Sequence, residues 1–333
     1  MTEQIDTAEL TIGIVGLGLM GSSITVSLLL AGHKVVAIAP VAGEKETASK
    51  HIRDLLALCD RTGLLTKPRK AYLASLTISY DYRELSSCCL VLECVIEDIE
   101  IKKAVYKRIM DAVSDEAIMA TNTSAIPISM LQQYVTNPGR FIGIHWAEPA
   151  FATRFMEITQ GDNTDVHVAE WVYDLAHCWG KEPTLLKKDI RGFITNRLMY
   201  AVYRETLSLV EKGQATLEDV DKAFRYDAGS WMTLMGIFRR MDFLGLKDFL
   251  VIFETLFPEL DNNDEPPAIM QRLIETKAGG IQNCHGLYDY TAEEAKRWDE
   301  AFAAFNGDIY YLAALYPSEQ IPQVYNEKMP GHL

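Results

Sequence analysis

A glycine-rich turn between an apolar run and a helical stretch constrains the fold of this chain more than any other feature of its sequence. The turn spans residues 16–21 and reads GLGLMG. It follows the apolar, β-branched run 10–15, and a stretch of helical character from 20 to 31 comes next, followed by a second strand-like run at 35–38. Strand, helix and strand within about thirty residues predict a βαβ unit, which belongs to a parallel sheet.

The three glycines of this turn have separate physical uses. The first permits a tight turn, the second lets a pyrophosphate approach the backbone, and the third lets the helix pack closely on the strand. The helix N-terminus then offers free N–H groups and a partial positive charge to phosphates. A purely structural glycine turn is the alternative, but the βαβ context favours a dinucleotide site. Its candidate residues are Gly16, Gly18, Leu19, Met20 and Gly21.

The alternation of strands and helices continues through the first half of the chain. Expected elements are a helix near 43–59, strands at 76–80 and 89–93, a helix at 99–113, and strands at 117–120 and 141–144. From residue 192 the pattern changes to long helices, at 195–213, 216–225 and 266–276. We therefore predict an α/β, Rossmann-type doubly wound parallel sheet in residues 1–190, an all-helical domain in 191–320 and a tail in 321–333.

Charge and cysteine usage narrow the class of protein. A net charge of −14 argues against a nucleic-acid partner, because such proteins usually carry basic surfaces. The six cysteines are scattered without a C-x-x-C pair, which favours reduced residues and the cytoplasm, and no metal site is predicted. The uncharged stretch 10–32 is long enough for a bilayer, but its glycine turn favours a buried βα unit, so no membrane partner is expected.

Four short motifs in the middle of the chain belong together in order and spacing. They are residues 120–124 (ATNTS), 143–149 (GIHWAEP), 154–158 (RFMEI) and 192–198 (GFITNRL). As a set, from about Thr11 to Tyr290, they resemble the 3-hydroxyacyl-CoA dehydrogenase family, which includes L-gulonate 3-dehydrogenase (lambda-crystallin) and carnitine dehydrogenase branches. The resemblance implies NAD-dependent oxidation of a 3-hydroxyacyl-CoA to the 3-ketoacyl-CoA, as in fatty acid metabolism. It also implies a homodimer formed through the helical domain.

The chemistry of such an oxidation explains two of the residues. When hydride leaves a carbinol carbon, the hydroxyl proton must leave as well, and a neutral histidine accepts it near pH 7. His145, at the end of an expected strand, is the candidate base. Glu157, on the following strand, is the candidate carboxylate for the other ring nitrogen, where it would stabilise the imidazolium.

The remaining site residues come from the resemblance. Ser124 and Asn196 match residues that hydrogen-bond the substrate oxygen, so the candidate catalytic set is His145, Glu157, Ser124 and Asn196. Other matches lie near the cofactor. Beyond the glycine turn, the candidate cofactor-binding residues are Ala39, Glu97, Lys102, Asn122 and Glu148.

Two positions depart from the pattern of the family. Ala39 stands where NAD-binding domains usually carry an acid for the ribose, so the expected cofactor is NAD, with NADP not excluded. Glu148 replaces the usual asparagine before the proline of the histidine motif, and Arg154 is its candidate partner. The second departure bears on the substrate.

Three other functions are consistent with parts of the sequence. One is a dehydrogenase of a small free 3-hydroxy acid, as in the gulonate and carnitine branches. Another is a non-catalytic protein that binds the dinucleotide. The β-hydroxyacid dehydrogenases related to 3-hydroxyisobutyrate dehydrogenase share the glycine turn, but they use a helical lysine, and Tyr200 stands four residues after Asn196 here.

Overall fold

The computed structural model describes residues 6–316 of the 333-residue chain. The chain divides into two compact units, residues 1–197 and residues 198–333. Helix α7 (Thr195–Glu211) runs across this division, and the boundary predicted at residue 190 lies just before it. The predicted tail at 321–333 lies outside the described residues.

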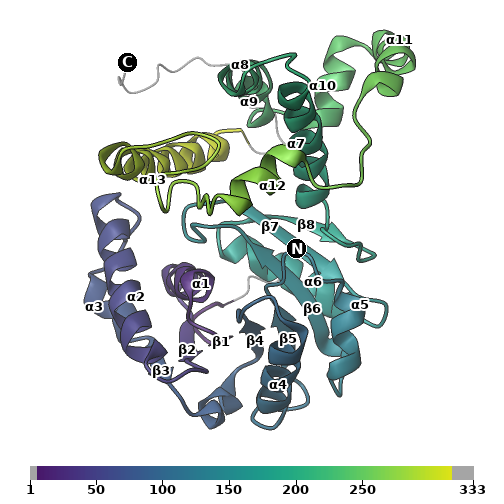
Figure 1. Ribbon diagram of the computed structural model, residues 1–333. Coiled ribbons are helices and arrows are strands. Elements are labelled where there is room, and N and C mark those ends of the chain that lie inside the picture. Colours follow the sequence, from purple (N-terminus) through teal and green to yellow (C-terminus); the bar gives the residue numbers. More distant parts are fainter. Residues whose placement is uncertain (1–5, 317–333) are drawn as a thin grey trace, which may run out of the picture. The chain divides into compact units, whose positions relative to one another are not determined.

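An eight-stranded sheet organises the first unit (Figure 1). Its order is β3-β2-β1-β4-β5-β6-β7-β8, so the strand order reverses between β1 and β4, which confirms the Rossmann-type prediction. Ligands of such sheets bind at the carboxyl ends of the strands beside this reversal. The strands are β1 (Thr11–Val15), β2 (Lys34–Ile38), β3 (Leu76–Ser79), β4 (Leu90–Glu93), β5 (Ile118–Thr121), β6 (Phe141–Trp146), β7 (Phe155–Gln160) and β8 (Glu182–Leu186).

The sheet is mostly parallel, and the pair formed by β6 and β7 is antiparallel. The connection between them, residues 147–154, is too short for the crossover that a parallel neighbour needs. Strand β7 therefore turns back beside β6 and places His145 directly opposite Glu157. Strand β8, at the sheet edge, was not expected from the sequence.

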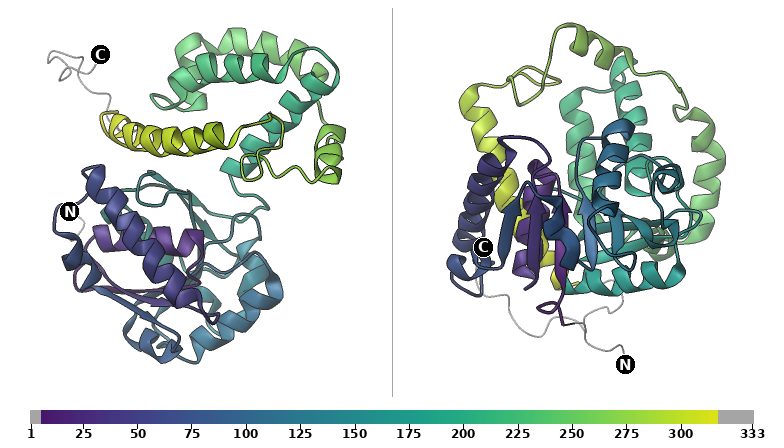
Figure 2. Two further views of the ribbon diagram at one scale, coloured as in Figure 1. Left: turned by 60° about the vertical axis from the view of Figure 1, so that its left-hand side comes forward. Right: turned by 90° about the horizontal axis from the view of Figure 1, so that it is seen from below.

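Helices cover both faces of the sheet (Figure 2). Alternate strand side chains point to opposite faces, so Ile12 and Ile14 pack with α1, α2 and α6, whereas Val91 and Met119 pack with α4 and α5. The uncharged stretch 10–32 forms β1 and α1, and no helix within residues 6–316 has the length and apolar character of a membrane span. The helices are α1 (Leu19–Leu30), α2 (Glu44–Arg61), α3 (Arg69–Leu73), α4 (Ile99–Met110), α5 (Ile128–Leu131) and α6 (Val166–Cys178), with 3-10 segments η1 (Tyr82–Ser87), η2 (Gln132–Tyr134) and η3 (Pro138–Arg140).

The second unit is helical, as the sequence predicts. The expected helix 216–225 is α8, which continues as a π-helical turn. Among the residues described in 198–316, only Ser208 and Ala295 are buried. After α7 the elements are α8 (Leu217–Ala223), η4 (Phe224–Ala228), α9 (Gly229–Met232), α10 (Ile237–Leu244), α11 (Leu246–Leu256), η5 (Phe257–Glu259), α12 (Ala268–Glu275) and α13 (Ala292–Ala314).

Candidate active site

The glycine turn joins β1 to α1 in the geometry that a pyrophosphate needs. Gly16 has φ +96°, which favours glycine, and a Cβ on Gly21 would lie 1.8 Å from the Gly16 carbonyl oxygen. A Cβ on Gly18 would meet nothing within 4 Å. Gly18 is also the N-cap of α1 and forms no side-chain cap, so the first amides of the helix are available to phosphate oxygens. The residues present therefore fit a dinucleotide.

Exposed aliphatic side chains lie at the carboxyl ends of the neighbouring strands. Leu19 follows β1, Val41 follows β2 and Ile96 follows β4, and all three are exposed. Exposed apolar side chains at strand ends beside the sheet reversal suit the flat, weakly polar ring of an adenine. Of these three residues, only Leu19 was predicted as a cofactor-binding residue. The signal for the other two was an apolar residue in a loop directly after a buried strand.

Of the predicted cofactor residues, Ala39 lies in the apolar core, whereas Glu148 carries a partly buried carboxyl group. Ala39 directly follows β2, its side chain is buried in the core, and its N–H donates to the Ser79 carbonyl at 2.9 Å. Burial raises the pKa of Glu148, and hydrogen bonds with Ser23 and the Ala150 amide oppose that shift in part. The Oε2 atom of Glu148 is buried without a hydrogen-bond partner among residues 6–316. The predicted partner, Arg154, forms an ion pair with Glu182 at 3.7 Å.

Glu97 and Lys102 brace the loops that follow β4 and β5. The buried ammonium group of Lys102 lies 2.9 Å from Glu93 and 3.2 Å from Glu97. Glu97 in turn accepts hydrogen bonds from the Thr123 hydroxyl and the Ser124 amide. Burial by itself would raise the pKa of Glu97, but the Thr123 and Lys102 contacts outweigh it, so the pKa is lowered. Glu93 was not predicted as a site residue, and its signal in the sequence was an acid at the end of an apolar strand.

Asn122, Ser124 and Asn196 come together beside the end of β6. The side-chain oxygen of Asn122 accepts the Trp146 amide at 2.9 Å. The side-chain amide of Asn196 donates to the Ser124 carbonyl at 2.8 Å, and Ser124 is exposed. The structure thus joins these residues through the loop after β5, although more than seventy positions separate Ser124 from Asn196.

His145 and Glu157 form a hydrogen-bonded pair across β6 and β7. Nδ1 of His145 lies 2.9 Å from Oε2 of Glu157. The other carboxylate oxygen accepts the amides of Ile194 at 3.0 Å and Thr195 at 2.9 Å, where α7 begins. Glu157 is buried, and the side chain of His145 is 12% exposed. Both carboxylate oxygens are therefore engaged, and the histidine has access to solvent.

The charge of Glu157 determines which nitrogen of His145 can act as a base. Burial alone would raise the pKa of Glu157, but hydrogen bonds from His145 and the two α7 amides outweigh it, so the pKa is lowered. An ionised carboxylate only accepts, so we assign the imidazole proton to Nδ1, which leaves Nε2 as the acceptor. Phe155 and Phe193 contact the ring at centroid distances of 5.4 and 5.9 Å and limit its rotation.

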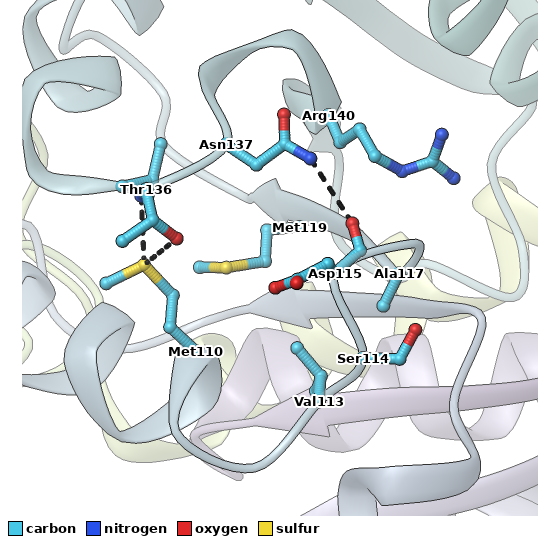
Figure 3. A pocket seen from close by; sticks show the side chains of 10 residues that line it. Met110, Val113, Ser114, Asp115, Ala117, Met119, Thr136, Asn137 and Arg140 are labelled. Atoms are coloured by element: carbon cyan, nitrogen blue, oxygen red, sulfur yellow. Dashed lines mark hydrogen bonds between the residues drawn. The ribbon is translucent and has the colours of Figure 1, made fainter.

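A small cavity lies at the opposite, amino-terminal ends of β5 and β6 (Figure 3). Its lining includes Asp115, Asn137 and Arg140, and Asn137 donates to the Asp115 carbonyl at 3.2 Å. The cavity holds about 30 Å³, which is room for about one water molecule. It is too small for an organic substrate.

Comparison with known proteins places this chain in a family. Family models described as the NAD binding domain and the C-terminal domain of 3-hydroxyacyl-CoA dehydrogenase match residues 11–190 and 192–290. The 5-formyl-3-hydroxy-2-methylpyridine 4-carboxylate 5-dehydrogenase of Mesorhizobium japonicum is 31% identical over 289 residues, 86% of this chain and 92% of the relative. A probable 3-hydroxybutyryl-CoA dehydrogenase of Deinococcus radiodurans is 28% identical over 279 residues, 84% of this chain and 99% of the relative.

Solved structures agree with the sequence matches. A crystal structure of a 5-formyl-3-hydroxy-2-methylpyridine 4-carboxylic acid 5-dehydrogenase, described as an NAD+-dependent dismutase, is 28% identical and has a TM-score of 0.85, covering 91% of this chain and 98% of that one. The FadB2 protein of Mycobacterium tuberculosis is 30% identical with a TM-score of 0.72, covering 86% and 100%. These matches confirm NAD as the cofactor and an oxidoreductase as the class of enzyme. The chain belongs to the 3-hydroxyacyl-CoA dehydrogenase family.

Proposed function

We propose that the protein oxidises the 3-hydroxyl carbon of a 3-hydroxyacyl-CoA to the 3-ketoacyl-CoA with NAD+, a reaction of fatty acid metabolism. The observation that carries the proposal is the His145–Glu157 pair, with Nδ1 of the histidine 2.9 Å from the carboxylate. This contact leaves Nε2 as the nitrogen that can accept a proton. Family membership supports the choice of reaction.

The residues of the chain supply acid–base chemistry and orientation. The glycine turn would hold NAD+, which would supply the acceptor for the hydride of the carbinol carbon. His145 Nε2 accepts the hydroxyl proton, and Glu157 stabilises the imidazolium that results. The Ser124 hydroxyl donates a hydrogen bond to the reacting oxygen, and Asn196 holds the Ser124 loop through its carbonyl. In the reverse direction the same His145 nitrogen returns the proton.

A second candidate is a small free acid in place of the thioester. The Mesorhizobium japonicum relative is named for a carboxylated pyridine, and the corresponding structure has the TM-score of 0.85. Glu148 bears on the choice between the two candidates, because a carboxyl group with a buried Oε2 stands where the family carries asparagine. The gulonate-like and carnitine-like acids belong to the same class.

The test follows absorbance at 340 nm in both directions for the wild type and for His145→Gln. The substrates are 3-hydroxybutyryl-CoA and acetoacetyl-CoA, L-gulonate, carnitine and 5-formyl-3-hydroxy-2-methylpyridine 4-carboxylate, each with NAD(H) and NADP(H). Thioester turnover that falls about 10²–10⁴-fold in the variant supports the first proposal. Turnover of a free acid alone selects the second. Cofactor binding without any turnover would favour a non-catalytic dinucleotide-binding protein.

The proposal includes a homodimer in the cytoplasm. The support for the dimer is the near absence of buried residues in the part of 198–316 that the structure describes, together with the exposure of many of its large apolar side chains. A helical unit of this size that buries two residues has too little core for independent stability. The cytoplasmic location rests on the scattered cysteines, which include no C-x-x-C pair.

A further inference from the structure

The position that usually selects between NAD and NADP carries no polar side chain in this protein. An acid at the end of the second strand normally accepts hydrogen bonds from the adenosine ribose. Here that residue is Ala39, which is buried, and residues 40–43 carry no charge. A family that uses NAD nevertheless needs a group that recognises the ribose and disfavours a 2′-phosphate.

Glu44 brings a carboxylate to this place from a different element. It is the first residue of α2, after Gly43, whose φ of +84° turns the chain. Its Oε1 accepts the amide of Leu17 at 2.7 Å, and Leu17 is the second residue of the glycine turn. Its Oε2 lies 3.4 Å from the Val41 amide. The carboxylate therefore lies against the turn that receives the dinucleotide.

This carboxylate keeps hydrogen-bonding capacity. An ionised carboxylate accepts about four hydrogen bonds, and the contact from Val41 is long. The side chain is half-buried, and its hydrogen-bond partners among residues 6–316 are these two backbone amides, with no cation. Glu44 also follows Gly21 by 23 residues, close to the spacing of about twenty at which the ribose acid normally stands.

We propose that Glu44 is the residue that binds the adenosine ribose and selects NAD over NADP. Its carboxylate accepts a hydrogen bond from the 2′-hydroxyl of that ribose, and it repels the phosphate that NADP carries at the 2′ position. Glu44 thus supplies from the first turn of α2 the function that Ala39 cannot. The inference rests on NAD binding and not on the identity of the substrate.

A structural alternative assigns Glu44 only the task of holding the glycine turn through Leu17. The two roles differ in their dependence on the ribose. If Glu44 only held the glycine turn, its substitution would change the affinity for every dinucleotide by the same factor. If Glu44 binds the ribose, its substitution changes the affinity only for dinucleotides that carry a 2′ substituent. The Glu44→Gln variant separates them, because its amide oxygen can still accept the Leu17 N–H while the charge is lost.

The experiment measures dissociation constants by calorimetric titration, without substrate, for NADH, NADPH and NADH that lacks the 2′-hydroxyl of the adenosine ribose. We expect the wild type to bind NADH about 100-fold more tightly than NADPH, and Glu44→Gln to reduce this preference at least about tenfold. Loss of the 2′-hydroxyl should weaken binding to the wild type about tenfold and to the variant less than about twofold.

Glu46→Gln is the matched control, because Glu46 lies on the same helix turn and binds the exposed Tyr80 hydroxyl at 2.8 Å. It should reproduce all three wild-type constants. Thermal melting with and without NADH verifies that each variant folds. If Glu44→Gln does not fold, Glu44→Ser is titrated with the same three ligands. Equal weakening of all three ligands, or unchanged constants, would overturn the proposal. Either result is independent of whether the enzyme acts on a thioester.

Discussion

The two units of this chain differ in what they bury. Residues 6–197 form two apolar clusters, one on each face of the sheet, and every residue of the proposed catalytic set lies in this unit. In the described part of 198–316 two residues are buried, while side chains such as Phe238, Phe243 and Leu250 are exposed. The first unit can therefore hold its reacting groups in place by itself. The second exposes large apolar side chains, which we propose are covered by a second copy of the chain.

The largest effect we expect is on the catalytic pair of the first unit. In Glu157→Gln the amide cannot stabilise the imidazolium and no longer fixes the proton on Nδ1, so kcat should fall about 10²–10⁴-fold. The molecular mass in solution and the NADH dissociation constant should be unchanged. Steady-state kinetics and light scattering measure these quantities. Glu170→Gln, at an exposed position of α6, is the control, and an equal loss there would contradict the assignment.

A charge in the apolar surface of the second unit should dissociate the proposed dimer. Phe243 of α10 is 71% exposed, and Phe243→Asp should raise the dimer dissociation constant about 100-fold if the ring is buried by the partner. Sedimentation equilibrium measures this constant. Val166→Asp is the control, since Val166 is 58% exposed on α6 of the first unit. A variant that stays dimeric at every concentration would show that this surface is not the interface.

Dilution should separate the stabilities of the two units. If the second unit is stable only in the dimer, its stability depends on protein concentration. Below the concentration at which the dimer is fully associated, each tenfold dilution lowers the free energy of unfolding of this unit by up to about 1.4 kcal/mol. Hydrogen exchange followed by mass spectrometry should then show faster exchange in peptides from 198–316 and unchanged exchange in peptides from β1 and β4. Equal acceleration in both units would mean that they unfold together and that the comparison fails.

The smallest effect we expect is a pH dependence of the stability of the first unit, caused by Lys181. Burial lowers the pKa of Lys181 to about 7, and its ammonium group donates to the carbonyls of Ala150 and Thr153. Between about pH 7 and the unfolded value of 10.5 the unfolded chain binds more protons, so stability rises with pH. We expect a slope of about 1 kcal/mol per pH unit.

Denaturant unfolding between pH 7 and 8.5 measures this slope, and Lys181→Met should reduce it. The window ends at 8.5 because burial raises the pKa of Cys59 and Cys88 to about 12, so their contribution to stability is lost as pH rises from 9 towards 12. An identical slope in the variant would rule out Lys181 as its source.

The central strands that sequence patterns predicted are buried on both faces, whereas the predicted run 76–80 forms the half-buried edge strand β3. Runs such as 10–15 and 89–93 are continuous and apolar, which is the pattern of a central parallel strand. β8 was missed because it contains Glu182 and Pro183, and proline is tolerated at a sheet edge where an N–H is not needed. Its position became apparent only from its pairing with β7.

The sequence likewise predicted part of the candidate site. Glycine spacing and the motifs around His145 and Glu157 indicated the cofactor turn and the catalytic pair. Glu93 and Glu44 were missed, because each is an ordinary charged residue until its partner is known. Those partners are Lys102 and the Leu17 amide. Nothing local distinguishes Glu44 from Glu46, which binds an exposed tyrosine instead.

The sequence by itself determined the βαβ opening and the dinucleotide turn and predicted the candidate base, because these depend on local spacing and on residue chemistry. Tertiary structure alone decided three further features. They are the antiparallel register that sets His145 against Glu157, the reach of Glu44 to the turn, and the exposure of the helices after residue 198. Each depends on contacts between segments far apart in the chain, or on the lack of them, and no local pattern encodes such contacts.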